Sequence, residues 1–250
     1  MEYDGRMRYY LLHIPPSYEP AEPIPLVLNF HGGGGNAAGH QRITRMNETA
    51  DTFGFVVAYP AGTREDGKKI QLIQFWNIRK TITGQYREGT VVAETDDIGF
   101  VSALLDEIGG KMNLDNSRVY ATGLSNGGMF AYTLACALSD KIAAIAPVYG
   151  PFQGIPEQCQ PSRAVPIMHF HGIADTFAPY TGGSPACEPV ANEQIRSVDD
   201  TIAIWKEKNG CTEEKTITYS SGDATCESYS TCREDSTITL CTIQDGGHTW

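Results

Sequence analysis

The stretch 118–138, RVYATGLSNGGMFAYTLACAL, joins a short β-rich run, a glycine-flanked serine and a helix-like segment. Its centre, Gly123-Leu124-Ser125-Asn126-Gly127, is a Gly-x-Ser-x-Gly motif between a predicted strand and a predicted helix. In that context the turn is too tight for flanking side chains, and the serine is forced into a strained, exposed position. Its hydroxyl then stands at a helix N-terminus, where developing negative charge is favoured. We interpret Ser125 as a nucleophile rather than as part of a plain Gly/Ser turn.

A serine nucleophile needs a base, an acid that orients the base, and an oxyanion hole. In a strand–turn–helix site the catalytic groups follow the chain order Ser, Asp or Glu, His. The histidines after Ser125 are His169, His171 and His248. We interpret the first two as core groups, because they lie within or at the end of a predicted strand and precede the candidate acid. His248 is the predicted base.

The predicted acid is Asp175. It follows the buried strand 166–170 (PIMHF), which places its carboxylate at the same sheet edge as Ser125. Asp96 and Asp97 are the competing acids, but they precede the serine and begin a predicted helix. We therefore interpret these two as N-terminal helix charges.

The apolar run 26–30 (LVLNF) is typical of a parallel strand covered on both faces. It leads directly into four consecutive glycines at 32–35. Such a run loses much conformational entropy on folding, so it needs a reason. Rather than a flexible turn, we expect a loop that brings backbone N–H groups of the Gly33 region next to a reacting atom, as an oxyanion hole.

Strands and helices alternate along the remaining sequence and predict an α/β fold with a mostly parallel, doubly wound sheet and helices on both faces. The further elements expected are an edge strand at 7–13, helices at 40–52 and 197–208, and strands at 55–59, 142–148 and 237–243. Sites in such sheets lie beyond the carboxyl ends of the strands, where the loops carrying Gly33, Ser125, Asp175 and His248 should meet. One catalytic domain is expected over residues 1–250.

The net charge of −11 argues against nucleic acid or an anionic membrane as a partner. No apolar run approaches the length of a membrane span, and the N-terminus has neither a basic segment nor an apolar one typical of a signal peptide. We expect an ester substrate as the partner and no cofactor.

The seven cysteines indicate an exported protein with disulfides, because no Cys-x-x-Cys or Cys/His spacing favours a metal site. We expect two bridges in the terminal region, Cys211–Cys232 and Cys226–Cys241. For the other three cysteines two arrangements stay open: Cys136–Cys159 with Cys187 free, or Cys159–Cys187 with a buried Cys136 thiol.

The segment 62–95 is polar and without clear periodicity, which is typical of a functional excursion or of partial disorder. Its aromatic residues, in Phe75-Trp76-Asn77, could line a binding cleft or pack in the core as an apolar anchor. Trp76 and Trp250 are the candidate substrate-binding residues. The loop 176–191 is expected on the same side of the molecule.

These motifs together resemble the α/β-hydrolase esterases related to feruloyl (cinnamoyl) esterases and extracellular polyhydroxybutyrate depolymerases. The resemblance covers the chain from about Arg6 to its end, and it is carried by HGGGGN at 31–36, WN at 76–77, DDIGF at 96–100, GLSNGGM at 123–129, HFHGIAD at 169–175, NGC at 209–211 and GGHTW at 246–250. It implies Ser125 as nucleophile, His248 as base and Asp175 as acid. The backbone N–H groups of Asn126 and the Gly33 region would form the oxyanion hole.

The resemblance also implies a carboxylic-ester hydrolase. A feruloyl esterase acting on plant polysaccharide is the first expectation. A short-chain polyester depolymerase, an acetyl xylan esterase and a catalytically silent binding domain are the alternatives. Members of the family usually continue past His-Thr-Trp with a Pro–Gly turn and a closing helix, whereas this sequence ends at Trp250. A fragment of a longer protein, or its ordered part alone, would explain the difference.

Overall fold

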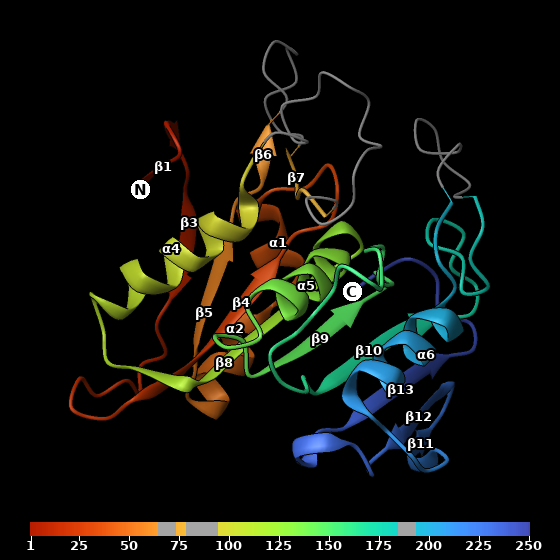
Figure 1. The fold of residues 1–250 in the computed structure, drawn as a ribbon. Coiled ribbons are helices and arrows are strands. Elements are labelled where there is room, and N and C mark those ends of the chain that lie inside the picture. The colour runs from red at the N-terminus through yellow and green to blue at the C-terminus, as the bar shows by residue number, and fades with distance from the viewer. Residues whose placement is uncertain (65–73, 79–94, 185–193) are drawn as a thin grey trace.

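The computed structural model describes residues 1–64, 74–78, 95–184 and 194–250. Its centre is a nine-stranded sheet in the order β11-β12-β13-β10-β9-β8-β4-β5-β3 (Figure 1). The strands are β3 (Tyr10–His13), β4 (Ile24–Phe30), β5 (Val56–Pro60), β8 (Leu114–Leu124), β9 (Ala144–Val148), β10 (Ile167–Gly172), β11 (Thr216–Ser221), β12 (Ala224–Tyr229) and β13 (Ile238–Ile243). Two short hairpins pair β1 (Glu2–Tyr3) with β2 (Arg6–Met7) and β6 (Thr63–Arg64) with β7 (Gln74–Phe75).

Most of the sheet is parallel, as the sequence predicted. Strands β5, β4, β8, β9, β10 and β13 run in one direction, and β3 pairs antiparallel with β5. At the other edge β12 pairs antiparallel with β13, and β11 pairs antiparallel with β12. The chain proceeds from β4 outward to β5 and then returns to place β8 on the other side of β4. In parallel sheets, such a reversal of the strand order creates a crevice at the carboxyl ends of the two adjacent strands, where ligands bind. Here these strands are β4 and β8.

Helices cover both faces of the sheet. They are α1 (Ala37–Thr44), α2 (Met46–Phe53), α4 (Asp97–Gly109), α5 (Asn126–Ala137) and α6 (Val198–Asn209), with a 3-10 turn at Arg233–Asp235. Side chains alternate along β5, so Val56 and Ala58 join the main core while Val57 and Tyr59 pack in a smaller cluster under α1 and α2. Within the described ranges, no helix is long and apolar enough to cross a bilayer. The α/β-hydrolase arrangement is confirmed.

One helix prediction is wrong in detail. The helix expected at 40–52 is two helices, α1 and α2, separated at Arg45. Arg45 adopts a left-handed backbone with φ 50°, and its N–H caps α1 by donating to the Gln41 carbonyl. The guanidinium of the same residue forms two hydrogen bonds with the Glu48 carboxylate in the first turn of α2. The spacing of apolar residues in the sequence does not show the left-handed backbone of a single residue, so the sequence predicted one continuous helix.

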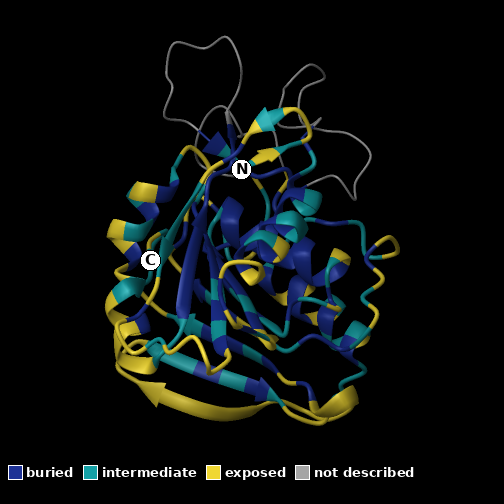
Figure 2. Ribbon diagram, turned by 90° about the vertical axis from the view of Figure 1, so that its left-hand side faces the viewer, coloured by how far each residue is buried: buried dark blue, intermediate teal, exposed yellow. Residues whose placement is uncertain are grey.

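The hydrophobic core lies between the sheet and the helices, and the β11–β12 hairpin lies outside this core. The central strands are mostly buried, whereas every residue of β11 is exposed (Figure 2). Because β11 and β12 bury little apolar surface, covalent bridges have much to contribute at this end of the sheet. Cys226–Cys241 joins β12 to β13 at directly opposed positions, and Cys211–Cys232 ties the end of α6 to the chain after β12. Both pairings were predicted.

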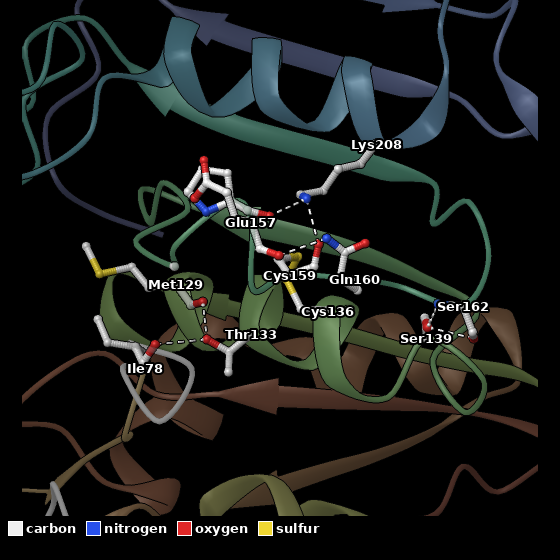
Figure 3. Close-up of a disulfide and its surroundings, with 12 residues drawn as sticks. Ile78, Met129, Thr133, Cys136, Ser139, Glu157, Cys159, Gln160, Ser162 and Lys208 are labelled. Carbon is white, nitrogen blue, oxygen red and sulfur yellow. Dashed lines mark hydrogen bonds between the residues drawn. A yellow bond between two sulfur atoms is a disulfide. The ribbon is translucent and has the colours of Figure 1, made fainter. Parts of the chain in front are cut away.

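The third disulfide joins Cys136 of α5 to Cys159 in the loop after β9 (Figure 3). Lys208 of α6 lies above the same loop and donates to the carbonyls of Pro156 and Cys159 at 2.7 and 2.6 Å. The first of the two predicted arrangements is therefore confirmed for this pair. Cys187, predicted to be free, lies outside the described residues. Removing a native bridge typically lowers the free energy of unfolding by about 2–5 kcal/mol.

Candidate active site

The turn from β8 into α5 has the strained geometry that the motif predicted. Ser125 has φ 56° and ψ −119°, values that an L-residue rarely adopts. A Cβ atom on either Gly123 or Gly127 would collide with the carbonyl oxygen of Phe30, the last residue of β4. The two glycines therefore let the turn press against the neighbouring strand, and the packing holds Ser125 in its strained conformation.

The structure brings His248 and Asp175 together across 73 positions of sequence. His248 Nδ1 lies 2.7 Å from Asp175 Oδ2, so the ring donates to the carboxylate through this nitrogen. The other ring nitrogen, Nε2, has no hydrogen-bond partner within the described residues. A neutral histidine held in this tautomer presents a free lone pair on Nε2 and can accept a proton there.

Asp175 is fully buried and its carboxylate is surrounded by donors. Oδ1 accepts the backbone N–H groups of Phe177 and Ala178 at 2.8 and 2.9 Å, while Oδ2 faces His248. Burial raises the pKa of the Asp175 carboxyl, but hydrogen bonds from His171, His248 and Ala178 outweigh it and lower the pKa well below the ordinary value. The carboxylate therefore stays charged and can stabilise a positive charge on His248.

His169 and His171 are buried core groups, as interpreted from the sequence, and they form a chain of hydrogen bonds. His171 Nε2–H donates to the Ala178 carbonyl at 2.8 Å, which leaves its Nδ1 to accept from His169 Nε2 at 3.1 Å. His169 Nδ1 then accepts the Tyr132 hydroxyl at 3.0 Å. Burial lowers the pKa of His169 well below its ordinary value, so this residue is neutral. The chain anchors the loop that carries Asp175.

Two aromatic residues that were not singled out in the sequence flank the His248 ring. Phe177 stacks on it with ring centroids 5.4 Å apart and an angle of 29°, and Tyr149 meets it edge-on at 5.7 Å. Phe177 is 51% exposed, so much of its ring faces solvent beside His248. Tyr149 follows β9, has φ 51°, and comes directly after Val148, whose carbonyl accepts the Ser125 N–H at 2.8 Å. The Ser125 turn and the His248 loop therefore meet at Tyr149.

The glycine loop lies against the Ser125 turn. A Cβ atom on Gly32 would stand 3.5 Å from Ser125 Cβ, and one on Gly33 would stand 3.5 Å from Asn126 Cβ. Neither the Gly33 N–H nor the Asn126 N–H has a hydrogen-bond partner in the described part of the chain. Two N–H groups near a nucleophile can bind a developing oxyanion.

His31 fixes the start of the glycine loop. Its Nε2 accepts the Gly62 N–H at 3.0 Å, so Nδ1 carries the proton and donates to the Gly32 carbonyl at 2.8 Å. Burial lowers the pKa of His31 to about 4, with the Gly32 hydrogen bond acting against the shift and the charge of Arg8 adding to it. This neutral histidine has a positioning role that the sequence alone did not indicate.

Trp76 is part of the scaffold behind the site. Its ring is fully buried, stacks on Phe130 with centroids 4.9 Å apart, and meets Phe30 edge-on. The indole N–H donates to the His31 carbonyl at 3.0 Å, and the Asn126 side chain holds the Trp76 backbone N–H at 2.7 Å. Of the two interpretations open for Trp76, the structure favours packing over a cleft wall.

Trp250, Asp96 and Asp97 are the other residues that were considered from the sequence. Trp250 is half-buried, and its ring meets His40 edge-on at 5.5 Å. Asp96 caps α4 by accepting the Gly99 N–H at 3.0 Å. Asp97 is buried, pairs with Arg8 at 2.7 Å and accepts the Asn77 N–H at 2.8 Å. The interpretation of both acids as structural agrees with these contacts.

Replacing His31 with glutamine should weaken the acid sensitivity of the fold. Above a pH of about 6.5 His31 is neutral in both states, whereas between about 6.5 and about 4 only the unfolded chain binds a proton there. This difference lowers the free energy of unfolding by about 2 kcal/mol between pH 7 and pH 5. Urea unfolding at both pH values should show the wild type losing that much more stability than His31→Gln, and equal losses would contradict a buried neutral His31.

Comparisons with known proteins agree with this fold. Residues 8–157 match the family described as "Esterase PHB depolymerase". Over 98% of its length the chain is 30% identical to "Putative esterase NocK" of Nocardia uniformis subsp. tsuyamanensis, of which it covers 71%. It is 28% identical over 96% of its length to "Feruloyl esterase B" of Piromyces equi, of which it spans only 42%. The solved structure of an acetyl xylan esterase from Aspergillus awamori superposes with a TM-score of 0.66 at 16% identity, covering 96% of this chain and 88% of that one.

The fold and the matches define a carboxylic-ester hydrolase of the α/β-hydrolase class. Within that class, the chain belongs to the Esterase PHB depolymerase family. The resemblance noted in the sequence is thereby confirmed.

Proposed function

We propose that this chain is a serine feruloyl esterase that releases hydroxycinnamic acids from plant polysaccharide. Ser125 is the nucleophile, His248 the general base, and Asp175 the acid that orients His248. The observation that carries the proposal is the 2.7 Å contact between His248 Nδ1 and the buried Asp175 carboxylate, on the sheet edge where Ser125 stands in a strained turn.

The reaction follows from these roles. His248 Nε2 takes the proton of the Ser125 hydroxyl as its oxygen attacks the ester carbonyl, and the N–H groups of Gly33 and Asn126 stabilise the oxyanion. The imidazolium, stabilised by Asp175, gives its proton to the departing alcohol oxygen, which leaves an acyl-enzyme. Water then attacks the acyl carbon while His248 takes its proton, and collapse of the second oxyanion returns that proton to Ser125 and releases the acid.

An aromatic acyl group suits the surroundings of His248. Phe177 lies on the His248 ring and is 51% exposed, so it offers apolar surface beside the reacting atoms. A planar hydroxycinnamoyl group gains both burial and stacking against such a ring. Phe177 takes the place that Trp76 had in the sequence-based expectation, since Trp76 is buried behind the site. The relative named feruloyl esterase supports the same substrate class.

We further propose that the enzyme is exported. Three disulfides link the described residues, and such bridges persist in oxidising compartments. An acidic, exported enzyme fits a substrate in the plant cell wall, with no nucleic acid or membrane as partner. A short-chain polyester or acetylated xylan is the alternative ester, because the family description and the structural neighbour carry those names.

The substrate class can be decided by comparing kcat/KM on methyl ferulate, a hydroxybutyrate oligomer and acetylated xylan. We expect methyl ferulate to be the best of the three. Phe177→Ala should lower kcat/KM roughly tenfold on methyl ferulate and far less on p-nitrophenyl acetate, because only the larger acyl group reaches the ring.

Phe53→Ala is the matched control, since Phe53 is 76% exposed at the end of α2 and is expected to affect neither substrate. If ferulate is the poorest substrate and the oligomer turns over well, polyester hydrolysis replaces the feruloyl proposal. If Phe177→Ala affects both esters alike, Phe177 does not contact the acyl group.

A further inference from the structure

His171 takes no part in the proposed reaction, yet it contacts the loop that carries Asp175. It lies near the end of β10, is fully buried, and has a defined partner at each ring nitrogen. The Nε2–H group donates to the Ala178 carbonyl at 2.8 Å. The same nitrogen lies 3.4 Å from Asp175 Oδ2. A residue in this position can act on the proposed acid without touching the substrate.

The Nε2–H group of His171 acts on both oxygens of Asp175. Ala178, whose carbonyl it binds, donates its own N–H to Asp175 Oδ1 at 2.9 Å. Holding the Ala178 carbonyl therefore holds the donor to Oδ1. Oδ2 accepts the His248 Nδ1–H at 2.7 Å, and the positive end of the His171 N–H dipole lies near the same oxygen. Such donors favour the charged carboxylate and fix the direction from which Oδ2 meets His248.

The tautomer of His171 is set by the residues on its other side. A neutral imidazole carries one hydrogen, and His171 needs it on Nε2 to donate to Ala178. Nδ1 must then accept, and its partner is His169 Nε2 at 3.1 Å. His169 can donate there because its own Nδ1 accepts the Tyr132 hydroxyl. The hydrogen bonds therefore all run in one direction, from Tyr132 to the Asp175 loop.

Neighbouring rings hold the His171 imidazole in place. The rings of Tyr149 and Tyr180 lie with their centroids 5.2 and 5.8 Å from that of His171. The His169 ring is nearly parallel to it, with an angle of 8° and centroids 5.3 Å apart. A ring held in this way keeps Nε2–H directed toward the Asp175 loop.

The loop that follows His171 is in contact with the loop that leads to His248. A Cβ atom on Gly172 would collide with the carbonyl oxygen of Gly246, so the close approach of the two loops requires glycine at 172. The same carbonyl accepts the Ala174 N–H at 3.1 Å. Because the two loops touch, a shift in the position of Asp175 would change its contact with His248.

We propose that His171 is a positioning residue, which orients Asp175 through its Nε2–H group while the hydrogen bonds from Tyr132 and His169 hold it in the donating tautomer. This inference rests on the proposed function, because it gives His171 a role toward the acid of the proposed triad. His171 contacts no reacting atom and acts only by holding the carboxylate that orients His248. Loss of its Nε2–H group should therefore lower kcat and leave KM nearly unchanged.

Two substitutions of His171 separate the roles of its two ring nitrogens. The amide nitrogen of glutamine can take the place of Nε2 and donate to Ala178, whereas the shorter asparagine reaches only the position of Nδ1 and keeps the acceptor for His169. His171→Asn should lower kcat on p-nitrophenyl acetate roughly fiftyfold, with KM within about twofold, because a small misplacement of a catalytic group costs about that much. His171→Gln should keep kcat within about fivefold of the wild type, because it retains the donor.

Nuclear magnetic resonance of the histidine rings gives a readout that does not depend on turnover. Two-bond nitrogen–proton spectra of the wild type should show His169 and His171 protonated on Nε2, and His248 protonated on Nδ1. The His248 Nδ1 proton is deshielded by its hydrogen bond to Asp175. Its resonance should stay downfield in His171→Gln and move upfield in His171→Asn. A wild-type His171 protonated on Nδ1 would contradict the proposal, and this measurement needs no variant that folds.

Asn209→Ala is the matched control. Asn209 is also fully buried, and its amide forms two hydrogen bonds with the backbone of Val165, which precedes the amino end of β10. The variant should lower the midpoint of urea unfolding, as His171→Asn should, but leave kcat of the folded enzyme unchanged. Equal kcat values for His171→Asn and His171→Gln, or a loss of kcat in Asn209→Ala as large as in His171→Asn, would each overturn the inference.

Asp175→Asn separates this inference from the function on which it rests. If Asp175→Asn loses activity while His171→Asn keeps it, His171 has no positioning role and the esterase proposal stands. If no ester is hydrolysed by the wild type and the His248 proton still moves upfield in His171→Asn, the positioning role stands and the proposed function falls.

Discussion

Replacing Ser125 with alanine should lower kcat on p-nitrophenyl acetate by about five to six orders of magnitude, because no acyl-enzyme can form without the hydroxyl. Burst kinetics on the wild type should show one released p-nitrophenolate per enzyme before steady turnover, provided that deacylation is slower than acylation. The variant should show none. The residual rate reports the oxyanion hole and substrate binding alone.

Ser125→Gly separates catalysis from backbone strain. It should be as inactive as Ser125→Ala but more stable, by roughly 1–2 kcal/mol, because glycine accepts the φ of 56° without a Cβ clash. Ser220→Ala on the exposed strand β11 is the matched control and should retain full activity. Equal rates from wild type and Ser125→Ala would refute the nucleophile and restore the alternative of a catalytically silent domain on this scaffold.

Asp175→Asn should lower kcat by about four orders of magnitude while the protein still folds. An asparagine at this position can offer His248 Nδ1 an amide group in place of a carboxylate, which favours the wrong tautomer and removes the charge that stabilises the imidazolium. The loop should keep its shape, because the amide oxygen can still accept the backbone N–H groups of Phe177 and Ala178. The measurement is kcat on p-nitrophenyl acetate, with circular dichroism to verify the fold.

Asp97→Asn is the matched comparison, since Asp97 is also a fully buried carboxylate but contacts Arg8 and the Asn77 backbone instead of a histidine. Breaking this buried pair should lower the free energy of unfolding by about 3–5 kcal/mol. The folded fraction should keep most of its activity. If Asp97→Asn is crippled in catalysis while Asp175→Asn is near normal, the assignment of the acid is wrong.

The sequence predicted those parts of the molecule that are encoded locally. The turn at Ser125 could be predicted because strand, glycines, serine and helix occupy one continuous segment, and β4 contacts that segment through its own carboxyl end. The parallel sheet could be predicted because each buried strand appears in the sequence as a separate apolar run. The position of Asp175 after the buried strand 166–170 indicated the acid, and the chain order of serine, acid and histidine then left His248 as the base. The structure places these two residues in hydrogen-bond contact.

Features that depend on contacts between distant segments were decided by the tertiary structure. Trp76 and Phe177 are both aromatic residues in polar loops, yet one is buried against Phe130 and the other is half exposed on His248. His31 became a positioning residue only because Gly62, 31 residues away, donates to it. A residue type fixes what a side chain can do, but burial and partners depend on which segments pack against it, and that packing is a property of the whole chain.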